Sequence, residues 1–142
     1  MKIKCFLALF FAMALSACGS KLYTPYNLFS DTHFRFQNYI RWKEYKTASI
    51  YLQKQSNQKI NDEYLEALKK YNITNYEDQG CVPDVTGDII NCTDLIKYHH
   101  VDSASIKTLR YNQKWVFNAD SKVWLLESGL PDFYANSNKQ SK

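Results

Sequence analysis

Cysteine has the widest chemistry of any residue in this chain, because a thiolate can act as a nucleophile, ligate a metal or form a disulfide. The four cysteines fall into two groups. Cys5 and Cys18 lie at the two ends of an apolar stretch near the start of the chain, whereas Cys81 and Cys92 lie in a more polar region. The two groups have different surroundings and are therefore interpreted separately.

The first twenty residues have the pattern of an export signal. Lys2 and Lys4 give a positive start, an uncharged apolar run covers residues 5–15, and the small residues 16–20 follow. A membrane-spanning helix needs about 20 apolar residues, so this short run predicts a secretory signal peptide over residues 1–17. The alternative is a buried N-terminal helix, and the lack of a polar face disfavours it.

The end of this signal, Leu15-Ser16-Ala17-Cys18, resembles the lipobox of bacterial lipoproteins. The resemblance implies that a peptidase cleaves before Cys18 and that the Cys18 thiol becomes a diacylglyceryl thioether. Cys5 would be discarded with the signal. Residues 18–27 would then form a lipidated tether, in which we expect Pro25 to prevent an early helix.

Lipidation of Cys18 would decide where the protein resides. Each buried methylene of an acyl chain contributes about 0.8 kcal/mol to membrane binding. One acyl chain therefore binds a protein to a bilayer only reversibly, whereas two or more chains anchor it stably. Ser20 lies two positions after the cysteine, where Asp favours retention in the inner membrane of Gram-negative bacteria. The resemblance therefore implies a lipid anchor in the outer membrane, at its periplasmic face.

Cys81 and Cys92 remain after export, and an even pair in an oxidising compartment predicts a disulfide. It would stabilise the fold by about 3 kcal/mol on the chain-entropy model. A metal pair and a reactive dithiol are the alternatives. Both are disfavoured, because the spacing is not C-x-x-C and no His or second Cys pair lies at zinc-ligand intervals.

The histidines and acids predict no metal site. Adjacent residues on a strand point to opposite faces, so we expect one of His99 and His100 to face outward and the other to be packed. His33, alone on a predicted helix, is interpreted in the same way. Four acidic residues lie close together in the sequence, but their spacing is not that of an EF-hand loop. We expect them to be solvated residues in turns and at strand edges. These acids are Asp84, Asp88, Asp94 and Asp102.

No catalytic residue and no cofactor are predicted either. Ser128 is not within a G-x-S-x-G motif, and the 4 glycines form no phosphate-binding loop. Aromatic residues make up 15% of the chain. They either fill the core, as we expect of Trp115 and Trp124 across a hairpin, or line a ligand pocket. The candidate pocket residues are Tyr39, Tyr45, Tyr76, Tyr98 and Tyr111.

The elements that position these side chains are predicted to begin with three helices. The first begins at Leu28 with Ser30 or Asp31 as its cap. At residues 34–36 apolar and polar side chains alternate, so a strand is the alternative there. The apolar stripe of this first helix comprises Phe29, Phe36 and Ile40, with Trp42 nearby. The second covers residues 44–52, and residues 53–60 form a loop. The third follows Asn61 as N-cap and ends at Asn72.

Four strands are predicted to follow, over residues 73–82, 89–101, 105–118 and 123–128. In the third, Leu109, Tyr111, Trp115 and Phe117 alternate with polar residues, which is typical of a half-buried strand. Helices followed by an antiparallel meander predict an α+β domain over residues 28–133, with the helices on one face of a curved sheet. Residues 134–142 form a polar C-terminal tail.

Four segments carry a resemblance in this domain: Arg41-Trp42-x-x-Tyr45, Tyr71-x-Ile73-Thr74-x-Tyr76-Glu77, Gln113-x-Trp115-x-Phe117 and Trp124-x-Leu126-Glu127-Ser128-Gly129-Leu130-Pro131. With the element order, they resemble the NTF2-like (cystatin-like) superfamily of cone-shaped α+β domains. The resemblance covers most of residues 28–133 and implies a fold with ligand sites at the open end of the cone. It assigns no role to any single residue.

Length and charge restrict the function further. A chain of 142 residues predicts one domain, and a net charge of +4 is too mild and mixed for nucleic-acid binding. We therefore expect a lipid-anchored envelope lipoprotein with a non-enzymatic binding or assembly domain and an envelope protein partner. The alternative is a small hydrophobic ligand-binding protein or enzyme that uses the cone interior. A third interpretation, a partner on the outer sheet face, predicts an apolar patch there.

Overall fold

The computed structural model describes residues 25–54 and 60–134. The predicted signal peptide, Cys5 and Cys18 lie outside the described residues, as do residues 135–142 of the predicted tail. The described elements are α2 (Pro25–Arg41), α3 (Tyr45–Ala48), the 3₁₀ turn η1 (Ser49–Tyr51), α4 (Asp62–Leu68), β1 (Tyr71–Pro83), β2 (Ile89–His100), β3 (Lys107–Asn118) and β4 (Val123–Leu126). Helices precede an antiparallel sheet, which confirms the predicted α+β class.

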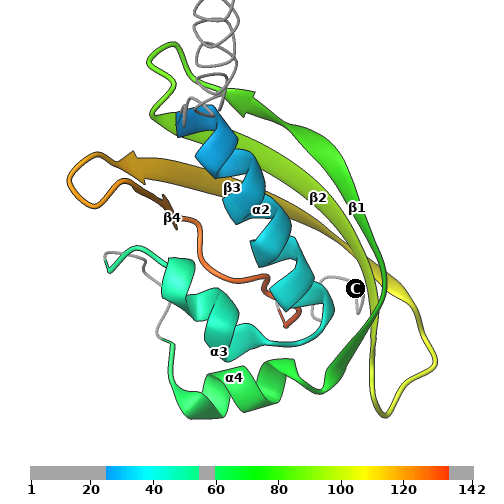
Figure 1. Cartoon of the computed structure of the whole chain (residues 1–142). Helices are drawn as coiled ribbons and strands as arrows, with labels where there is room; N and C mark the ends of the chain where they lie inside the picture. The colour runs from blue at the N-terminus through cyan, green and yellow to red at the C-terminus, as the bar shows by residue number, and fades with distance from the viewer. Residues whose placement is uncertain (1–24, 55–59, 135–142) are drawn as a thin grey trace, which may run out of the picture.

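The four strands form one open, curved sheet in the order β1-β2-β3-β4 (Figure 1). Each strand pairs antiparallel with its neighbour along the chain. The sequence-predicted strands agree with these bounds to within two residues at each end, because the alternation of buried and exposed side chains is regular on β2 and β3.

Helix α2 crosses the concave face of this sheet (Figure 1). Its buried positions recur every three or four residues, which is the period of an amphipathic helix. They are Phe29, His33, Phe36 and Ile40. The helix confirms the predicted apolar stripe, excludes a strand at residues 34–36, and adds a histidine to the buried side.

The predictions about the two ends of this helix were wrong. The helix begins at Pro25 and not at Leu28, since proline at the first helical position loses no hydrogen bond and already has a helical φ. Residues 25–27 are therefore helical and not part of a tether, and neither Ser30 nor Asp31 is the cap. Trp42 lies just beyond the helix with 74% of its surface exposed, outside the core.

The other helices are short. The predicted helix over residues 44–52 is one turn of α3 that continues into η1. The predicted cap of α4 is confirmed, because Asn61 Oδ1 accepts a hydrogen bond from the Tyr64 amide at 2.8 Å. The predicted terminator Asn72 is wrong: α4 ends at Leu68, and Asn72 pairs with His99 in the sheet.

The chain after β4 turns back over the concave face and passes between α2 and α3 (Figure 1). Leu130 and Phe133 are buried. Two core tyrosines hold this segment, because Tyr111 donates to the Gly129 carbonyl at 2.6 Å and Tyr98 donates to the Phe133 carbonyl at 3.3 Å. The space between the sheet and the helices is therefore occupied by the chain's own C-terminal residues.

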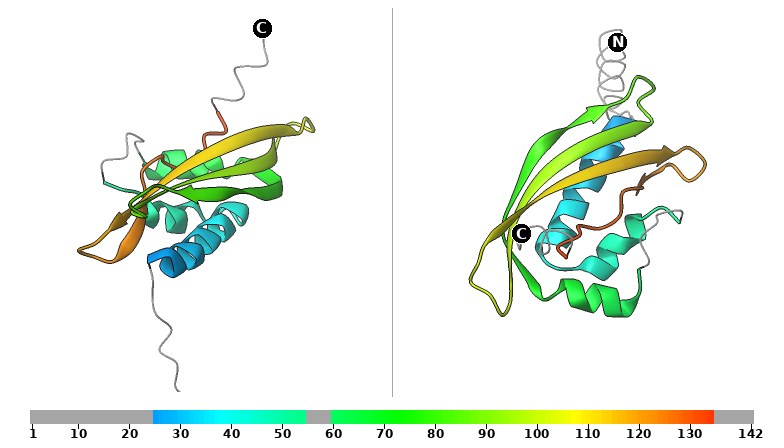
Figure 2. Two further views of the ribbon diagram at one scale, coloured as in Figure 1. Left: turned by 90° about the horizontal axis from the view of Figure 1, so that it is seen from above. Right: turned by 180° about the vertical axis from the view of Figure 1, so that it is seen from behind.

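The convex face of the sheet is not covered by the described helices (Figure 2). Its exposed side chains on β2 and β3 are polar, among them Asn91, Lys97, Arg110 and Asn112, while Ile89, Leu95 and Val116 on the same face are half-buried. Within residues 25–54 and 60–134, no exposed large apolar side chain lies on β2 or β3. The exposed part of these two strands is therefore polar.

Candidate functional site

Polar side chains are buried where α2 crosses β1, β2 and β3. This buried polar cluster consists of His33, Tyr76, Asp94 and Gln113, with the half-buried Gln37 at its edge. Asp94 has no exposed surface, and His33 and Gln113 are 5% and 2% exposed. Polar groups are rarely this deep unless they are paired, so the cluster is the first place to look for function.

The periodicity of each helix or strand explains why its side chains face the cluster. His33 and Gln37 are four residues apart on α2 and therefore share one side of the helix. Asp94 belongs to the inward-facing alternate positions of β2, and Gln113 to those of β3. The predicted pattern of β3 placed Tyr111 and Trp115 inward, so the intervening Gln113 had to face inward as well.

The carboxylate of Asp94 is the centre of the hydrogen bonds in the cluster. The Tyr76 hydroxyl donates to Oδ2 at 2.6 Å, the Gln113 amide also donates to Oδ2, and the Gln37 amide donates to Oδ1 at 3.3 Å. The Trp115 indole donates to Gln113 Oε1 at 2.9 Å and fixes that amide. These donors offset the cost of burying a carboxylate.

Burial controls the ionisation of the cluster. It raises the pKa of Asp94 against the hydrogen bond from Tyr76 and the charge of His33, which act in the opposite direction. Burial lowers the pKa of His33 against the attraction of Asp94. Both residues are therefore pushed toward their neutral forms, as expected of ionisable groups removed from water.

The predicted disulfide between Cys81 and Cys92 is confirmed. The strand register places these cysteines opposite each other on β1 and β2. A bulge lies just before Cys81, where Gly80 adopts a φ of +108° that favours glycine. The Asp78 carboxylate accepts a hydrogen bond from the Gly80 amide at 2.7 Å and closes the bulge.

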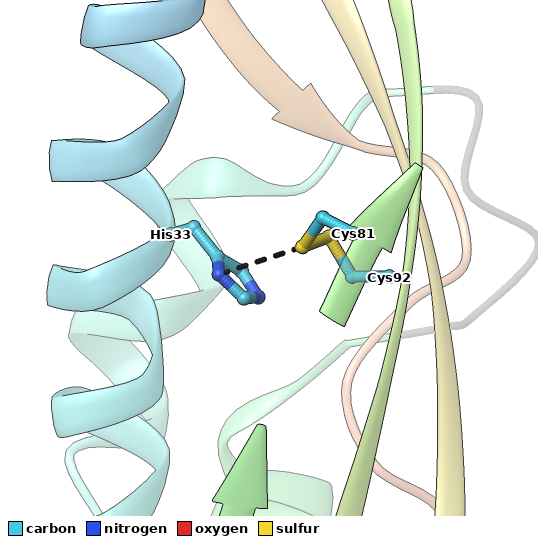
Figure 3. Close-up of side chains that lie close together, drawn as sticks. All are labelled: His33, Cys81 and Cys92. Carbon is cyan, nitrogen blue, oxygen red and sulfur yellow. Dashed lines mark hydrogen bonds between the residues drawn. A yellow bond between two sulfur atoms is a disulfide. The ribbon is translucent and has the colours of Figure 1, made fainter. Parts of the chain in front are cut away.

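His33 lies between this disulfide and the Asp94 carboxylate. Its Nδ1 is 3.9 Å from Cys81 Sγ (Figure 3), and its Nε2 is 3.9 Å from Asp94 Oδ2. A histidine between a sulfur and a carboxylate is an arrangement that cysteine nucleophiles use. Here the sulfur is bonded to a second sulfur and has no proton to give, so the oxidised protein lacks an activated thiol at this position.

A surface cleft of about 280 Å³ opens beside these residues, between α2 and β1. We call it the α2–β1 cleft. His33, Gln37, Asp78 and Cys81 line its polar part. Tyr26 and Phe34 also line it and are 59% and 64% exposed, so aromatic surface and hydrogen-bonding groups meet in one place.

A second cleft of about 320 Å³ lies along α2 beside β4 and η1. We call it the α2–β4 cleft. Leu28, Ile50, Val123 and Trp124 contribute to its more apolar lining. The Trp124 indole donates to the Pro25 carbonyl at 2.8 Å and holds the first turn of α2 against β4. Helix α2 is therefore shared by both clefts.

The five candidate pocket tyrosines do not line one cavity. Tyr45, Tyr76, Tyr98 and Tyr111 are buried in the core. Tyr39 is half-buried, with its ring 6.3 Å from that of Tyr51. Trp115 and Trp124 are also buried in the core, as expected. Four of the five tyrosines thus belong to the core, and Tyr76 also takes part in the buried polar cluster.

The remaining candidate residues are dispersed. His99 Nδ1 lies 3.0 Å from the Ser103 carbonyl, whereas His100 approaches Asp102 at 3.5 Å, so the two rings have separate surroundings. Asp84 accepts hydrogen bonds from Thr86 and the Gly87 amide within a turn, as expected. The prediction for Asp94 was wrong, because its position on β2 faces the core.

No protein-family model matches the chain, and neither a curated protein nor a solved structure does. None of the helices in the described part of the chain has both the length and the apolar character to cross a bilayer.

Proposed function

We propose that this chain is a bacterial envelope lipoprotein that is anchored in the outer membrane through lipid on Cys18 and binds a protein partner through the surface around α2. The apolar run, the small residues after it and the Leu15-Ser16-Ala17-Cys18 segment support the anchor. The proposed activity is binding or assembly and not catalysis, because the sulfur beside the His33–Asp94 pair is oxidised.

The start of α2 supports a position near the membrane. Pro25, the first residue of α2, follows Cys18 by only seven positions. A chain of that length spans at most about 25 Å when fully extended. A lipid on Cys18 would therefore keep the N-terminal end of α2, and the two clefts beside it, close to the bilayer surface.

The observation that carries the proposal is the exposed apolar surface on both sides of α2. Tyr26 and Phe34 border the α2–β1 cleft, and Ile50 and Val123 border the α2–β4 cleft. All four are exposed, with Ile50 at 68%. Aromatic and apolar side chains are enriched at protein–protein contacts, whereas the exposed positions of β2 and β3 on the convex face carry polar side chains.

We also propose that the domain is a variant of the NTF2-like cone. The curved antiparallel sheet with helices on its concave face supports this relationship. In this variant the C-terminal segment, through Leu130 and Phe133, occupies the concave interior. Binding is therefore assigned to the surface around α2 and not to the inside of the cone.

Labelling with radioactive palmitate tests the anchor. The full chain should incorporate label and fractionate with the outer membrane, and a Cys18→Ala variant should do neither. A Cys5→Ala variant is the matched control, because this cysteine lies in the discarded signal. Label that persists in Cys18→Ala would contradict the proposal.

Photocrosslinking in cells tests the binding surface. A benzophenone amino acid at Phe34 or Ile50 should give a discrete cross-linked protein, because both side chains are exposed beside α2. The same group at Lys97 or Asn112, on the convex face, is the control and should give none. Equal cross-linking from both faces, or none from α2, would contradict the proposal.

A second function is favoured by the α2–β4 cleft. Its volume of about 320 Å³ falls in the range of small-molecule sites, about 300–1,000 Å³, and Trp124 in its wall offers an optical probe. If the cleft takes a small hydrophobic ligand, an apolar dye should bind at one site and change Trp fluorescence. An Ile50→Ser variant should weaken this binding, while Val101→Ser, an exposed apolar position outside the cleft, should leave it unchanged.

A further inference from the structure

We propose that reduction of the Cys81–Cys92 disulfide creates a metal site in which His33 Nδ1 and the two thiolates bind a thiol-preferring divalent ion of the Zn²⁺ type. This inference is independent of the proposed function, because it rests on side chains of the folded domain and not on the anchor or on a partner.

The three ligand atoms are already together. His33 Nδ1, Cys81 Sγ and Cys92 Sγ all lie within 4.8 Å of one another (Figure 3). Around a tetrahedral ion with Zn–N and Zn–S bonds of about 2.0 and 2.3 Å, neighbouring ligands lie roughly 3.5 Å apart. The His33–Cys81 distance of 3.9 Å is therefore close to a bound geometry, and only the two sulfurs must move apart.

The backbone keeps the cysteines opposite each other without the disulfide. Asp78 pairs with Asp94 on one side of them, and Val82 pairs with Asn91 on the other. The strand β2 also pairs with β3 from Ile89 to Tyr98, on both sides of Cys92. Reduction thus frees the two side chains without removing the strand pairing that positions them.

The Asp94 carboxylate lies behind the His33 ring, slightly farther from Nε2 than a hydrogen bond. Nε2 faces the Asp94 carboxylate at 3.9 Å and the Gln37 amide at 3.5 Å. In the tautomer with the proton on Nε2, the Nδ1 lone pair points at the sulfurs, and the Gln37 amide donates to Asp94 Oδ1 and not to the ring. A carboxylate behind the ligating imidazole is the usual way in which proteins fix the tautomer and ring orientation of a metal ligand.

The α2–β1 cleft leaves room for a fourth ligand. His33 and Cys81 both line this cleft, so solvent reaches the side of the site that faces away from the core. One histidine, two cysteines and a water form a known zinc coordination set. Asp78, which also lines the cleft, adds a negative charge beside the entry path.

A dithiol supplies the reducing equivalents for this chemistry. Two electrons and two protons from the dithiol convert the Cys81–Cys92 bond into two thiols, and the reductant becomes a disulfide. Binding of the divalent ion then releases both thiol protons and leaves a neutral bis-thiolate site. A disulfide oxidant that takes up the two electrons and two protons becomes a dithiol and re-forms the Cys81–Cys92 bond, which removes both anionic ligands and releases the ion.

Cobalt(II) titration tests the site, because thiolate ligation gives Co²⁺ intense charge-transfer and visible bands. The full chain in detergent, carrying Cys5→Ser and Cys18→Ser, retains only the two relevant cysteines. After reduction with a phosphine it should bind one Co²⁺ with tetrahedral bands, and Zn²⁺ should displace it. The oxidised chain should show no such bands. Absence of these bands in the reduced chain would overturn the proposal.

Variants distinguish the site from loose binding to free thiols. His33→Gln should weaken Co²⁺ binding by more than the roughly 10–100-fold lost when a partner behind a ligand is removed, and Asp94→Asn should fall within that range. His99→Gln is the matched control and should bind like the parent. Equal affinity and bands in His33→Gln and the parent would overturn the proposal.

Thermal unfolding provides a second readout that does not depend on colour. Zn²⁺ should raise the melting temperature of the reduced parent, because an ion that binds only the folded state stabilises it. The same Zn²⁺ should leave the oxidised parent and the reduced His33→Gln variant unchanged. A Zn²⁺ effect of equal size in reduced His33→Gln would show that the histidine is not a ligand.

Discussion

At the scale of single residues, the core contains polar groups with very different partners. The hydroxyl of Tyr45 is buried without a hydrogen-bond partner within the described residues, and burial raises the pKa of Tyr45. The hydroxyl of Tyr111 is equally enclosed but donates to the Gly129 carbonyl at 2.6 Å. The two tyrosines therefore make a matched pair for measuring what a buried hydroxyl contributes.

We expect Tyr45→Phe to stabilise the protein by about 1 kcal/mol, because it removes a buried polar group that has no partner. Tyr111→Phe should destabilise it by about 1–2 kcal/mol, because the Gly129 carbonyl loses its donor. Urea unfolding of both variants measures the difference. Destabilisation by Tyr45→Phe as large as that by Tyr111→Phe would show that the Tyr45 hydroxyl has a partner after all.

At the scale of the elements, the short helix α4 depends on its cap. It has 7 residues, too few to be stable alone, and Asn61 satisfies the Tyr64 amide at its start. Asn61→Ala should lower the free energy of unfolding by about 1 kcal/mol. Asn61→Ser keeps a capping oxygen and should retain most of the stability, so equal losses in both variants would rule out capping as the cause.

The β1–β2 hairpin depends on the disulfide for part of its stability. Its loop is short, with Cys81 and Cys92 separated by 11 positions, so removal should cost about 3 kcal/mol on the chain-entropy model. We expect Cys81→Ala with Cys92→Ala to show this loss in urea unfolding, and metal-free reduced parent to show a similar one. A loss below about 1 kcal/mol would mean that strand pairing alone fixes the hairpin.

At the scale of the whole molecule, the aromatic core makes stability sensitive to alkali. Burial raises the pKa of Tyr64 to about 12 and raises the pKa of Tyr111 well above its ordinary value. In the unfolded chain these tyrosines lose their protons near pH 10. Above that pH the unfolded state binds fewer protons than the folded state, so stability falls as the pH rises.

We therefore expect the free energy of unfolding to be unaffected by these tyrosines below about pH 9 and to decrease steadily between about pH 10 and 12. Tyrosinate absorbance should then increase together with the loss of far-ultraviolet circular dichroism. Complete ionisation of the tyrosines near pH 10 in a protein that stays folded would contradict their burial.

Much of the fold could be predicted because its signals are local. The alternation at Leu109, Tyr111, Trp115 and Phe117 predicted β3, and Asn61 predicted the start of α4, since each pattern depends on a few neighbouring residues. Where another local rule competed, the prediction was wrong: Pro25 was expected to prevent a helix, although proline is also favoured at the first helical position.

The candidate site was only partly visible in the sequence. His33 lies between Phe29 and Phe36 on the apolar stripe of α2, and Gln113 lies between two inward-facing aromatic residues on β3. A polar residue at a position that must be buried was the available signal. Nothing in the spacing joined these residues to Asp94 or to the disulfide.

The sequence by itself determined the order of helices and strands, the pairing of Cys81 with Cys92 and the amphipathic faces, because periodicity and composition act over short distances. Only the tertiary structure decided that His33 meets Cys81, which follows it by 48 positions, that Asp94 is buried, and that the C-terminal segment fills the concave face. These outcomes depend on how α2 docks on the sheet and on the strand register, and both are set by packing among residues that are distant in the chain.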